Sequence, residues 1–312
     1  SALLAALLPG LWQCQSGSVE TANTAGVVPS FTVDPYWPKP LPAPKDENGY
    51  AHQWITGEPS GTCIDSHDHI ITVNRGWFRG GLVGYDGVRS GSIPSPPVVM
   101  YDTEGNVVGS WGDTTLSEDS VAVVMAQNFH GCHVDFEGNI WIASNGDGIV
   151  QKYSHDGQLL MQIGTKGLCD GPPTTSPDDP YPTCGEPGYN TSTTLLNEPS
   201  DVHVDPDPDP VTGEPGSIYI SDGYGNYRVV VFDRQGKYLR QWGEAGRGPG
   251  QFVETTSGHP HCVQIVQGLV YTCDRGPGDG IHQTRIQVFD KVGNLQQIIP
   301  IQAPGNMLRT SR

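Results

Sequence analysis

One phrase recurs four times along the chain, and it constrains the fold more than any other feature. Its fullest copy runs from Asn128 to Ala143, with apolar and β-branched residues on both sides of the turn Glu137-Gly138-Asn139. This pattern predicts a β-hairpin. The other three copies each join one apolar segment to a second: residues 61–65 to 70–73, 201–205 to 217–220, and 262–265 to 269–272.

A second predicted hairpin follows each copy and turns at a glycine. These hairpins cover residues 98–108, 150–160, 229–242 and 286–299. Four strands per unit, repeated in the same order, are typical of β-propeller blades. The sequence therefore predicts an all-β propeller with four visible blades. A β-sandwich or a β-helix is the alternative, and the ordered recurrence of both hairpins favours the propeller.

Length and charge fit one large all-β domain. A chain of 312 residues with 41 Gly and 27 Pro suits many turns between short strands. The net charge of −17 argues against nucleic acid and anionic membranes as partners, because both need a basic patch. We expect no membrane span, and a monomer when the protein is intact.

The first 30 residues look like a leader that precedes a propeller of residues 31–312. Ser1 to Leu11 is apolar, lacks a Met and is too short to span a bilayer, so it resembles the remains of a secretory signal. We therefore expect an exported protein, periplasmic or extracellular, in which disulfides can form. Of the seven cysteines, Cys14 is the odd one and Cys169 is predicted to pair with Cys184. Cys262 and Cys273 either pair or remain buried thiols.

Histidine occurs on alternate predicted blades, next to the innermost strand. His130 lies in this position in the second repeat and His261 in the fourth. The innermost strands of a propeller surround its channel, so the two rings can approach a common axis. Imidazole is a usual ligand for zinc, and a catalytic zinc takes three protein ligands and one open position. A zinc site is therefore one hypothesis, and two structural histidines are the other.

A second set of polar residues follows the second strand of the repeats. Arg75, Tyr224 and Arg275 occur at comparable positions and are expected near the same channel mouth. Paired arginines suit a carboxylate-bearing substrate. Nearby cations and a metal would lower the pKa of the tyrosine and make it a usable base. In the alternative, Arg228 and Arg275 only form ion pairs with the aspartates that precede them.

The remaining histidines are assigned no chemistry. His67 and His69 lie in a hairpin turn that we expect to be solvated. His133 and His203 lie at equivalent positions inside strands, which is typical of packing residues. His259 is kept as a weaker alternative ligand beside His261.

Four segments resemble a known family: NFHGCHVDFEGNIWIAS (128–144), NEPSDVHVDP (197–206), SIYISDGYGNYRVVVFDRQGKYLRQWG (217–243) and GHPHCVQI with YTCDR (258–275). They are similar to the NHL-repeat propeller of peptidylglycine α-hydroxyglycine amidating lyase and to bacterial exported NHL proteins. The resemblance runs from about Phe31 to Ile301. It implies an NHL-type, six-bladed propeller.

The resemblance also implies a set of site residues. His130 and His261 match two of three zinc ligands, Tyr224 matches the catalytic tyrosine, and Arg75 and Arg275 match the two active-site arginines. A structural calcium bound through main-chain carbonyls would map to Thr62 and Cys132. Gly225 departs from the pattern, since the animal enzyme has a disulfide-bonded cysteine there. The third zinc-binding histidine and the calcium-binding aspartate belong to a last blade that this sequence does not contain.

These observations lead to one favoured function and two alternatives. The favoured function is a zinc-dependent lyase that cleaves the C–N bond of an α-hydroxylated amide and releases an amide and glyoxylate. The alternatives are a non-catalytic NHL propeller that binds a protein or glycan, and a calcium-dependent lactonase-type propeller. We also expect about two further blades after Arg312, because the three-fold histidine pattern is one member short.

Overall fold

The computed structural model describes residues 31–75, 91–112, 125–126, 128–172, 188–253, 260–276 and 284–301. The chain divides into a unit of residues 1–36 and a unit of residues 37–312. The predicted leader of residues 1–30 lies outside the described residues, and residues 31–36 contain no helix or strand. The second unit contains all the described strands and is considered alone below.

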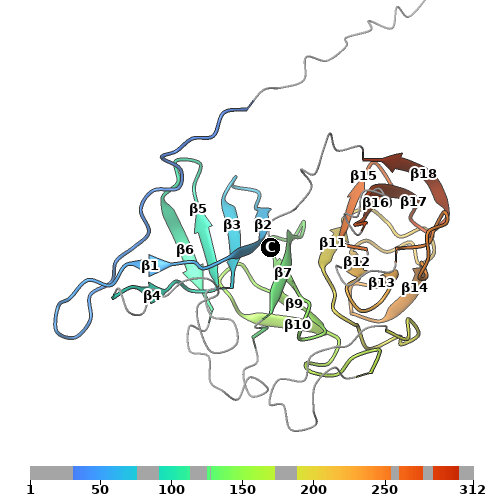
Figure 1. The fold of residues 1–312 in the computed structure, drawn as a ribbon, viewed down its shortest axis with the longest axis horizontal. Coiled ribbons are helices and arrows are strands. Elements are labelled where there is room, and N and C mark those ends of the chain that lie inside the picture. Colours follow the sequence, from blue (N-terminus) through green and yellow to red (C-terminus); the bar gives the residue numbers. More distant parts are fainter. Residues whose placement is uncertain are drawn as a thin grey trace, which may run out of the picture. The chain divides into compact units, whose positions relative to one another are not determined.

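Four antiparallel four-stranded sheets follow one another along the second unit (Figure 1). Blade 1 contains β2 (Pro59–Ile64), β3 (Ile70–Asn74), β5 (Val98–Tyr101) and β6 (Val107–Trp111). Blade 2 contains β7 (Phe129–Val134), β8 (Ile140–Ser144), β9 (Ile149–Tyr153) and β10 (Leu159–Ile163). Blade 3 contains β11 (Asp201–Asp205), β12 (Ser217–Asp222), β13 (Arg228–Phe232) and β14 (Tyr238–Trp242). Blade 4 contains β15 (Cys262–Val266), β16 (Leu269–Asp274), β17 (Arg285–Asp290) and β18 (Leu295–Pro300).

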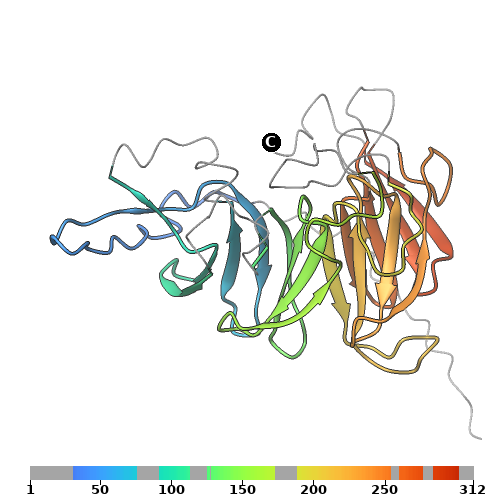
Figure 2. The same ribbon diagram turned by 90° about the horizontal axis from the view of Figure 1, so that it is seen from below.

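This arrangement confirms the prediction of an all-β chain built from four-stranded blades. A separate parallel pair, β1 (Trp54–Ile55) and β4 (Ile93–Pro94), was not predicted. The first strands of successive blades are neighbours: β2 contacts β7, β7 contacts β11, and β11 contacts β15. Figure 2 shows the four sheets in this order from a second direction. Within the described residues, no segment is a helix that could cross a lipid bilayer.

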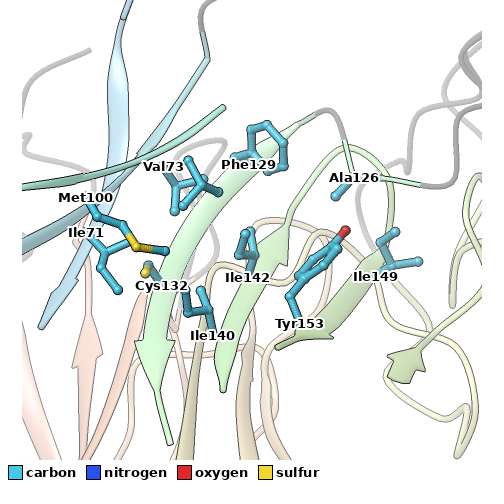
Figure 3. Packing of buried hydrophobic residues seen from close by; sticks show 11 residues of the cluster. Ile71, Val73, Met100, Ala126, Phe129, Cys132, Ile140, Ile142, Ile149 and Tyr153 are labelled. Carbon is cyan, nitrogen blue, oxygen red and sulfur yellow. The ribbon is translucent and has the colours of Figure 1, made fainter. Parts of the chain in front are cut away.

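Hydrophobic clusters fill the interfaces between successive blades. Between blades 1 and 2, Ile71, Val73 and Met100 face Phe129 and Ile142 (Figure 3). Alternation along a strand lets one strand serve two interfaces. Ile218 and Ile220 pack toward blade 2, whereas the intervening Tyr219 packs toward blade 4. The apolar strands are therefore buried on both faces of a blade.

Most hairpin turns use the same aspartate-based structure. In blade 2, the Oδ1 atom of Asp135 accepts hydrogen bonds from the backbone N–H groups of Glu137 and Asn139. Gly138 between them has a φ of 83°, a left-handed conformation that glycine adopts without strain. Asp65 makes the same two bonds in blade 1, to His67 and His69. The repeated Asp and Gly are therefore turn residues, which explains why the hairpins could be recognised in the sequence.

Two disulfides lie in the described residues. Cys262 and Cys273 form one across the first hairpin of blade 4, so the first of the two predicted alternatives, a disulfide rather than buried thiols, is confirmed. The second, Cys63–Cys132, was not predicted and joins the innermost strands of blades 1 and 2. Cys169 is also in a disulfide, and its predicted partner Cys184 lies outside the described residues. Such bonds are typical of exported proteins.

Candidate functional site

Four of the predicted site residues meet at one end of the blades. His130 is near the start of β7 and His261 directly precedes β15. Tyr224 is in the loop after β12, and Arg275 directly follows β16. In an antiparallel hairpin the first strand begins where the second ends, so all four positions share one end of the sheets.

The hydroxyl group of Tyr224 is the centre of this cluster. It lies 2.9 Å from Nε2 of His130 and 3.0 Å from Nε2 of His261. Arg275 donates a hydrogen bond of 3.3 Å to the same oxygen. The two imidazole rings lie edge to face, with centroids 4.9 Å apart. Residues from three blades thus converge on one oxygen atom.

The hydrogen bonds of His130 determine which of its ring nitrogens carries the hydrogen. Its Nδ1 atom lies 2.7 Å from the carbonyl oxygen of Ser200. A carbonyl only accepts, so Nδ1 carries the hydrogen. Burial, assisted by the nearby Arg75 and Arg275 guanidinium groups, lowers the pKa of His130 to about 4. The ring is therefore neutral near pH 7, and Nε2 presents its lone pair to Tyr224.

Tyr224 adopts an unusual backbone conformation. Its φ of 63° lies in the left-handed region, which costs a non-glycine residue about 1–2 kcal/mol. Strain of this kind often accompanies function, and here it accompanies a side chain aimed at two histidines. The adjacent Gly225 is required by packing, because a Cβ there would lie 2.2 Å from the side chain of Asn197.

The expected lowering of the Tyr224 pKa is not found in the protein alone. Burial raises the pKa of Tyr224, and this effect outweighs the opposing influence of Arg275 and Arg75. Glu198 raises it further. The two cations therefore reduce, but do not reverse, the cost of forming a phenolate here.

The arginines near this end of the blades fall into two sets according to their position in the repeat. Arg75 follows the second strand of blade 1, donates a hydrogen bond of 2.6 Å to the carbonyl of Phe129, and lies 3.9 Å from Glu58. It is therefore held beside His130, without a described bond to Tyr224. Arg275 occupies the same repeat position in blade 4 and reaches Tyr224.

Arg228 and Arg285, which begin the third strands of blades 3 and 4, form the structural pairs instead. Arg228 bonds Asp222 at 2.9 Å, and Arg285 bonds Asp274 at 2.7 Å. The alternative of a purely structural ion pair thus holds for Arg228. For Arg275 it is wrong, because Arg285 takes the Asp274 carboxylate.

Thr62 and Cys132, the positions matched to a structural calcium, lie elsewhere. They belong to the neighbouring strands β2 and β7, and Cys132 is bonded to Cys63. The rings of His133 and His203 contact each other with centroids 4.3 Å apart and planes tilted by 35°, in agreement with the prediction that they are packing residues. His259 lies outside the described residues.

Asp201 also belongs to this region and was not predicted from the sequence. It is the first residue of β11, and its Oδ2 atom accepts a 3.1 Å hydrogen bond from the backbone N–H of Val263. A Cβ on Gly131 would lie 2.6 Å from Asp201 Oδ1, so glycine is needed where β7 passes. Desolvation raises the pKa of Asp201 to about 7. No local pattern distinguishes it from the many turn aspartates.

We expect this carboxyl group to make the protein less stable as pH rises. The folded state holds the proton up to about pH 7, whereas the unfolded chain releases it near pH 3.9. The stabilisation is complete below about pH 4 and is lost as pH rises from 4 to 7, by at most roughly 4 kcal/mol. Asp201→Asn should therefore raise the melting temperature at pH 8 and flatten its dependence on pH between 4 and 7.

Thermal unfolding followed by circular dichroism at several pH values measures this effect. Asp207→Asn is the control, because that side chain is 68% exposed and its replacement should leave the profile unchanged. An Asp201→Asn profile that matches the wild type would contradict a raised pKa at this position.

The histidine donors fit a zinc ion. The Nε2 atom of His130 carries no hydrogen. The imidazole ring is oriented by a hydrogen bond to a backbone carbonyl, as is common for metal-bound histidines. Nε2 of His261 faces the same hydroxyl oxygen. Among the described residues, the one group of three or more side chains that could hold a metal lies elsewhere, so this part of the chain offers two candidate ligand atoms here.

Comparisons with known proteins agree with the fold. A family model described as a 6-bladed beta-propeller matches residues 209–258. Peptidylglycine alpha-amidating monooxygenase of Rattus norvegicus is 26% identical over 256 residues, covering 75% of this chain and 21% of that protein. Peptidyl-glycine alpha-amidating monooxygenase B of Xenopus laevis is 35% identical over 247 residues, covering 75% and 23%.

A shorter relative carries only the lyase name. The "Probable peptidyl-alpha-hydroxyglycine alpha-amidating lyase" of Caenorhabditis elegans is 21% identical over 225 residues, covering 70% of this chain and 52% of that protein. The chain thus spans about a fifth of the vertebrate relatives and about half of the nematode one. On this fold and these similarities, the chain is a β-propeller that resembles the amidating lyases.

Proposed function

We propose that this propeller is a zinc-dependent lyase that cleaves the C–N bond of an α-hydroxylated amide, such as a peptidyl-α-hydroxyglycine. The single observation that carries the proposal is the convergence of His130, His261 and Arg275 on the Tyr224 hydroxyl. The amidating enzymes to which the chain is similar support it. The products are an amide and glyoxylate.

His130 and His261 would bind the zinc through Nε2, together with a ligand from outside the described residues. When bound there, zinc supplies a Lewis acid that polarises the substrate hydroxyl group. Imidazole ligands suit this metal. Two main-chain carbonyls, of Thr62 and Cys132, are proposed to help hold a structural calcium.

The cationic side chains give the site its preference for a carboxylate. Arg275 bonds Tyr224 and Arg75 lies close enough to influence the pKa of that residue, so both guanidinium groups border the same space. A guanidinium fork binds a carboxylate through two parallel hydrogen bonds. The glycine-derived carboxylate of the substrate would be held here, with its carbinol carbon beside Tyr224.

Tyr224 acts as the base in this scheme. In its phenolate form, which Arg275 and Arg75 stabilise, it accepts the proton of the substrate hydroxyl group. The electron pair of that O–H bond forms the C=O bond of glyoxylate as the C–N bond breaks. The amide nitrogen keeps the electrons of the C–N bond and takes the proton from Tyr224, which regenerates the phenolate, so atoms and charge balance.

The test is release of glyoxylate from a synthetic peptidyl-α-hydroxyglycine by the purified, exported protein. We expect turnover, about one zinc per chain at this site, and loss of both from His130→Ala and His261→Ala. Stoichiometric zinc retained at this site by both variants would contradict the metal assignment. Wild-type protein that releases no glyoxylate would favour a propeller that binds a protein or glycan without catalysis.

A further inference from the structure

A second group of metal-ligating side chains lies at the opposite end of blades 1 and 2. Asp65 follows β2, His69 directly precedes β3, and His155 is in the turn between β9 and β10 of the next blade. His69 Nδ1 and His155 Nε2 each lie 2.9 Å from the same oxygen, Asp65 Oδ2. Nδ1 of His67 lies 4.0 Å from that oxygen. The turn expected to be solvated is therefore part of a contact between blades.

Repeat-equivalent positions in the other blades show how unusual this contact is. In blades 2, 3 and 4, the second residue of the turn between the third and fourth strands contacts an acidic residue of the preceding blade. Arg234 of blade 3 bonds Glu137 at 2.9 Å, and Lys291 of blade 4 bonds Asp205 at 2.6 Å. Only at the junction of blades 1 and 2, among the described blades, does an imidazole take the place of the cation.

The other partner of Asp65 has changed as well. In blade 2, the residue four positions after the turn aspartate is Asn139, whose amide group bonds Asp135. The corresponding residue in blade 1 is His69. Asp65 thus faces two imidazoles, whereas the equivalent Asp135 faces an amide group and the equivalent Asp205 an ammonium group. Imidazole and carboxylate together are ligands for borderline divalent metals, whereas amide and ammonium groups are not the pair such metals select.

The geometry suits a metal ion. At ligand distances of about 2.1 Å, two ligand atoms lie about 3.0 Å apart at right angles and about 3.4 Å apart in a tetrahedron. The two observed oxygen–nitrogen separations are 2.9 Å. All three ligand atoms lie within 4.8 Å of one another. Small ring rotations would therefore place the three atoms around one ion.

The ligands are also held in place before any ion binds. The Asp65 side chain is 2% exposed, and its Oδ1 atom is fixed by the two backbone N–H groups of the turn, which leaves Oδ2 for the imidazoles. The indole N–H of Trp111 donates a 3.1 Å hydrogen bond to the carbonyl of His155 and so docks that turn on blade 1. The Cys63–Cys132 disulfide joins the same two blades close by.

We propose that Asp65, His69 and His155 form a second metal site, which binds a divalent transition ion of the zinc class and clamps blade 1 to blade 2. His155 is 45% exposed, so an ion can enter from solvent. His67 at the rim supplies a further imidazole, and water completes the coordination. The site is separate from the Tyr224 cluster, because it lies at the other end of the strands.

Metal titration in a variant that lacks the first site tests this proposal. The metal-free His130→Ala/His261→Ala protein is titrated with Zn²⁺ by calorimetry and with Co²⁺ by visible absorption. We expect saturable binding of about one ion per chain and a rise in the melting temperature with added metal. Adding His155→Ala to that variant should lower the affinity at least about tenfold, the minimum seen even for loss of a supporting residue.

Two controls separate metal binding from folding. His155→Lys introduces the side chain that blade 4 uses at this position, so the ion pair with Asp65 can form while the metal ligand is lost. Lys291→Ala removes the equivalent contact between blades 3 and 4 and should leave metal binding unchanged. Metal uptake that is equal in the His130→Ala/His261→Ala protein with and without His155→Lys would overturn the proposal, and so would an absence of uptake in both.

Discussion

Tyr224→Phe should lower kcat for glyoxylate release by about 10²–10⁴-fold, the range that a positioned acid or base contributes. The substitution removes one oxygen atom, and that atom is where His130, His261 and Arg275 meet. The half-buried ring itself is kept, so the melting temperature should change little. Steady-state kinetics on a peptidyl-α-hydroxyglycine, with zinc content measured on the same sample, gives the result.

A second tyrosine in the same loop provides the matched control. Tyr227 packs into the cluster between blades 3 and 4, so Tyr227→Phe should keep kcat within about a factor of three. A zinc-loaded Tyr224→Phe enzyme with nearly normal kcat would show that another group takes the proton. A rise in KM with kcat unchanged would also contradict the role of a base, because it would mean that Tyr224 acts only on substrate binding.

The blades could be predicted because each repeat contains the residues that form its own turns. An aspartate whose carboxylate binds N–H groups two and four residues later, followed by a glycine with positive φ, defines a hairpin locally. Asp135 with Gly138 and Asp290 with Gly293 are two examples. Strand order then follows from chain order, and the positions of His130 and Tyr224 follow from the strand ends.

Contacts between blades could not be predicted in the same way. The Cys63–Cys132 disulfide joins residues 69 positions apart, and nothing local marks them as partners. The irregular pairing of β7 with β8 between Phe129 and Cys132 also shifts the alternation there, and such a shift changes the face on which a side chain lies. Asp65 and His155 belong to different repeats, so their meeting required the structure. The repeats nevertheless contained a signal of this contact, since His155 occupies the position that the cations Arg234 and Lys291 occupy in blades 3 and 4.

Arg228→Met should lower the free energy of unfolding by about 3–5 kcal/mol, the usual cost of removing one partner of a buried ion pair. Arg228 and Asp222 are both completely buried, and Asp170 lies 3.4 Å from the same guanidinium group. Arg228 also donates hydrogen bonds to the backbone carbonyls of Ser192 and Leu195. Methionine fills the space but leaves two acidic groups and two carbonyls without this donor. Denaturant unfolding at pH 7 measures the loss.

The control is an arginine of the same blade whose ion pair is exposed. Arg234 is 42% exposed and bonds Glu137, which is 41% exposed, so Arg234→Met should cost about 1 kcal/mol or less. Adding Asp222→Asn to Arg228→Met should restore part of the stability, because an unpaired buried charge is then removed. Equal stability of the Arg228→Met and Arg234→Met proteins would contradict this reasoning. It would mean that the fold at the base of the Tyr224 loop is held by the packing of Asn197 and Gly225 and not by the buried charges.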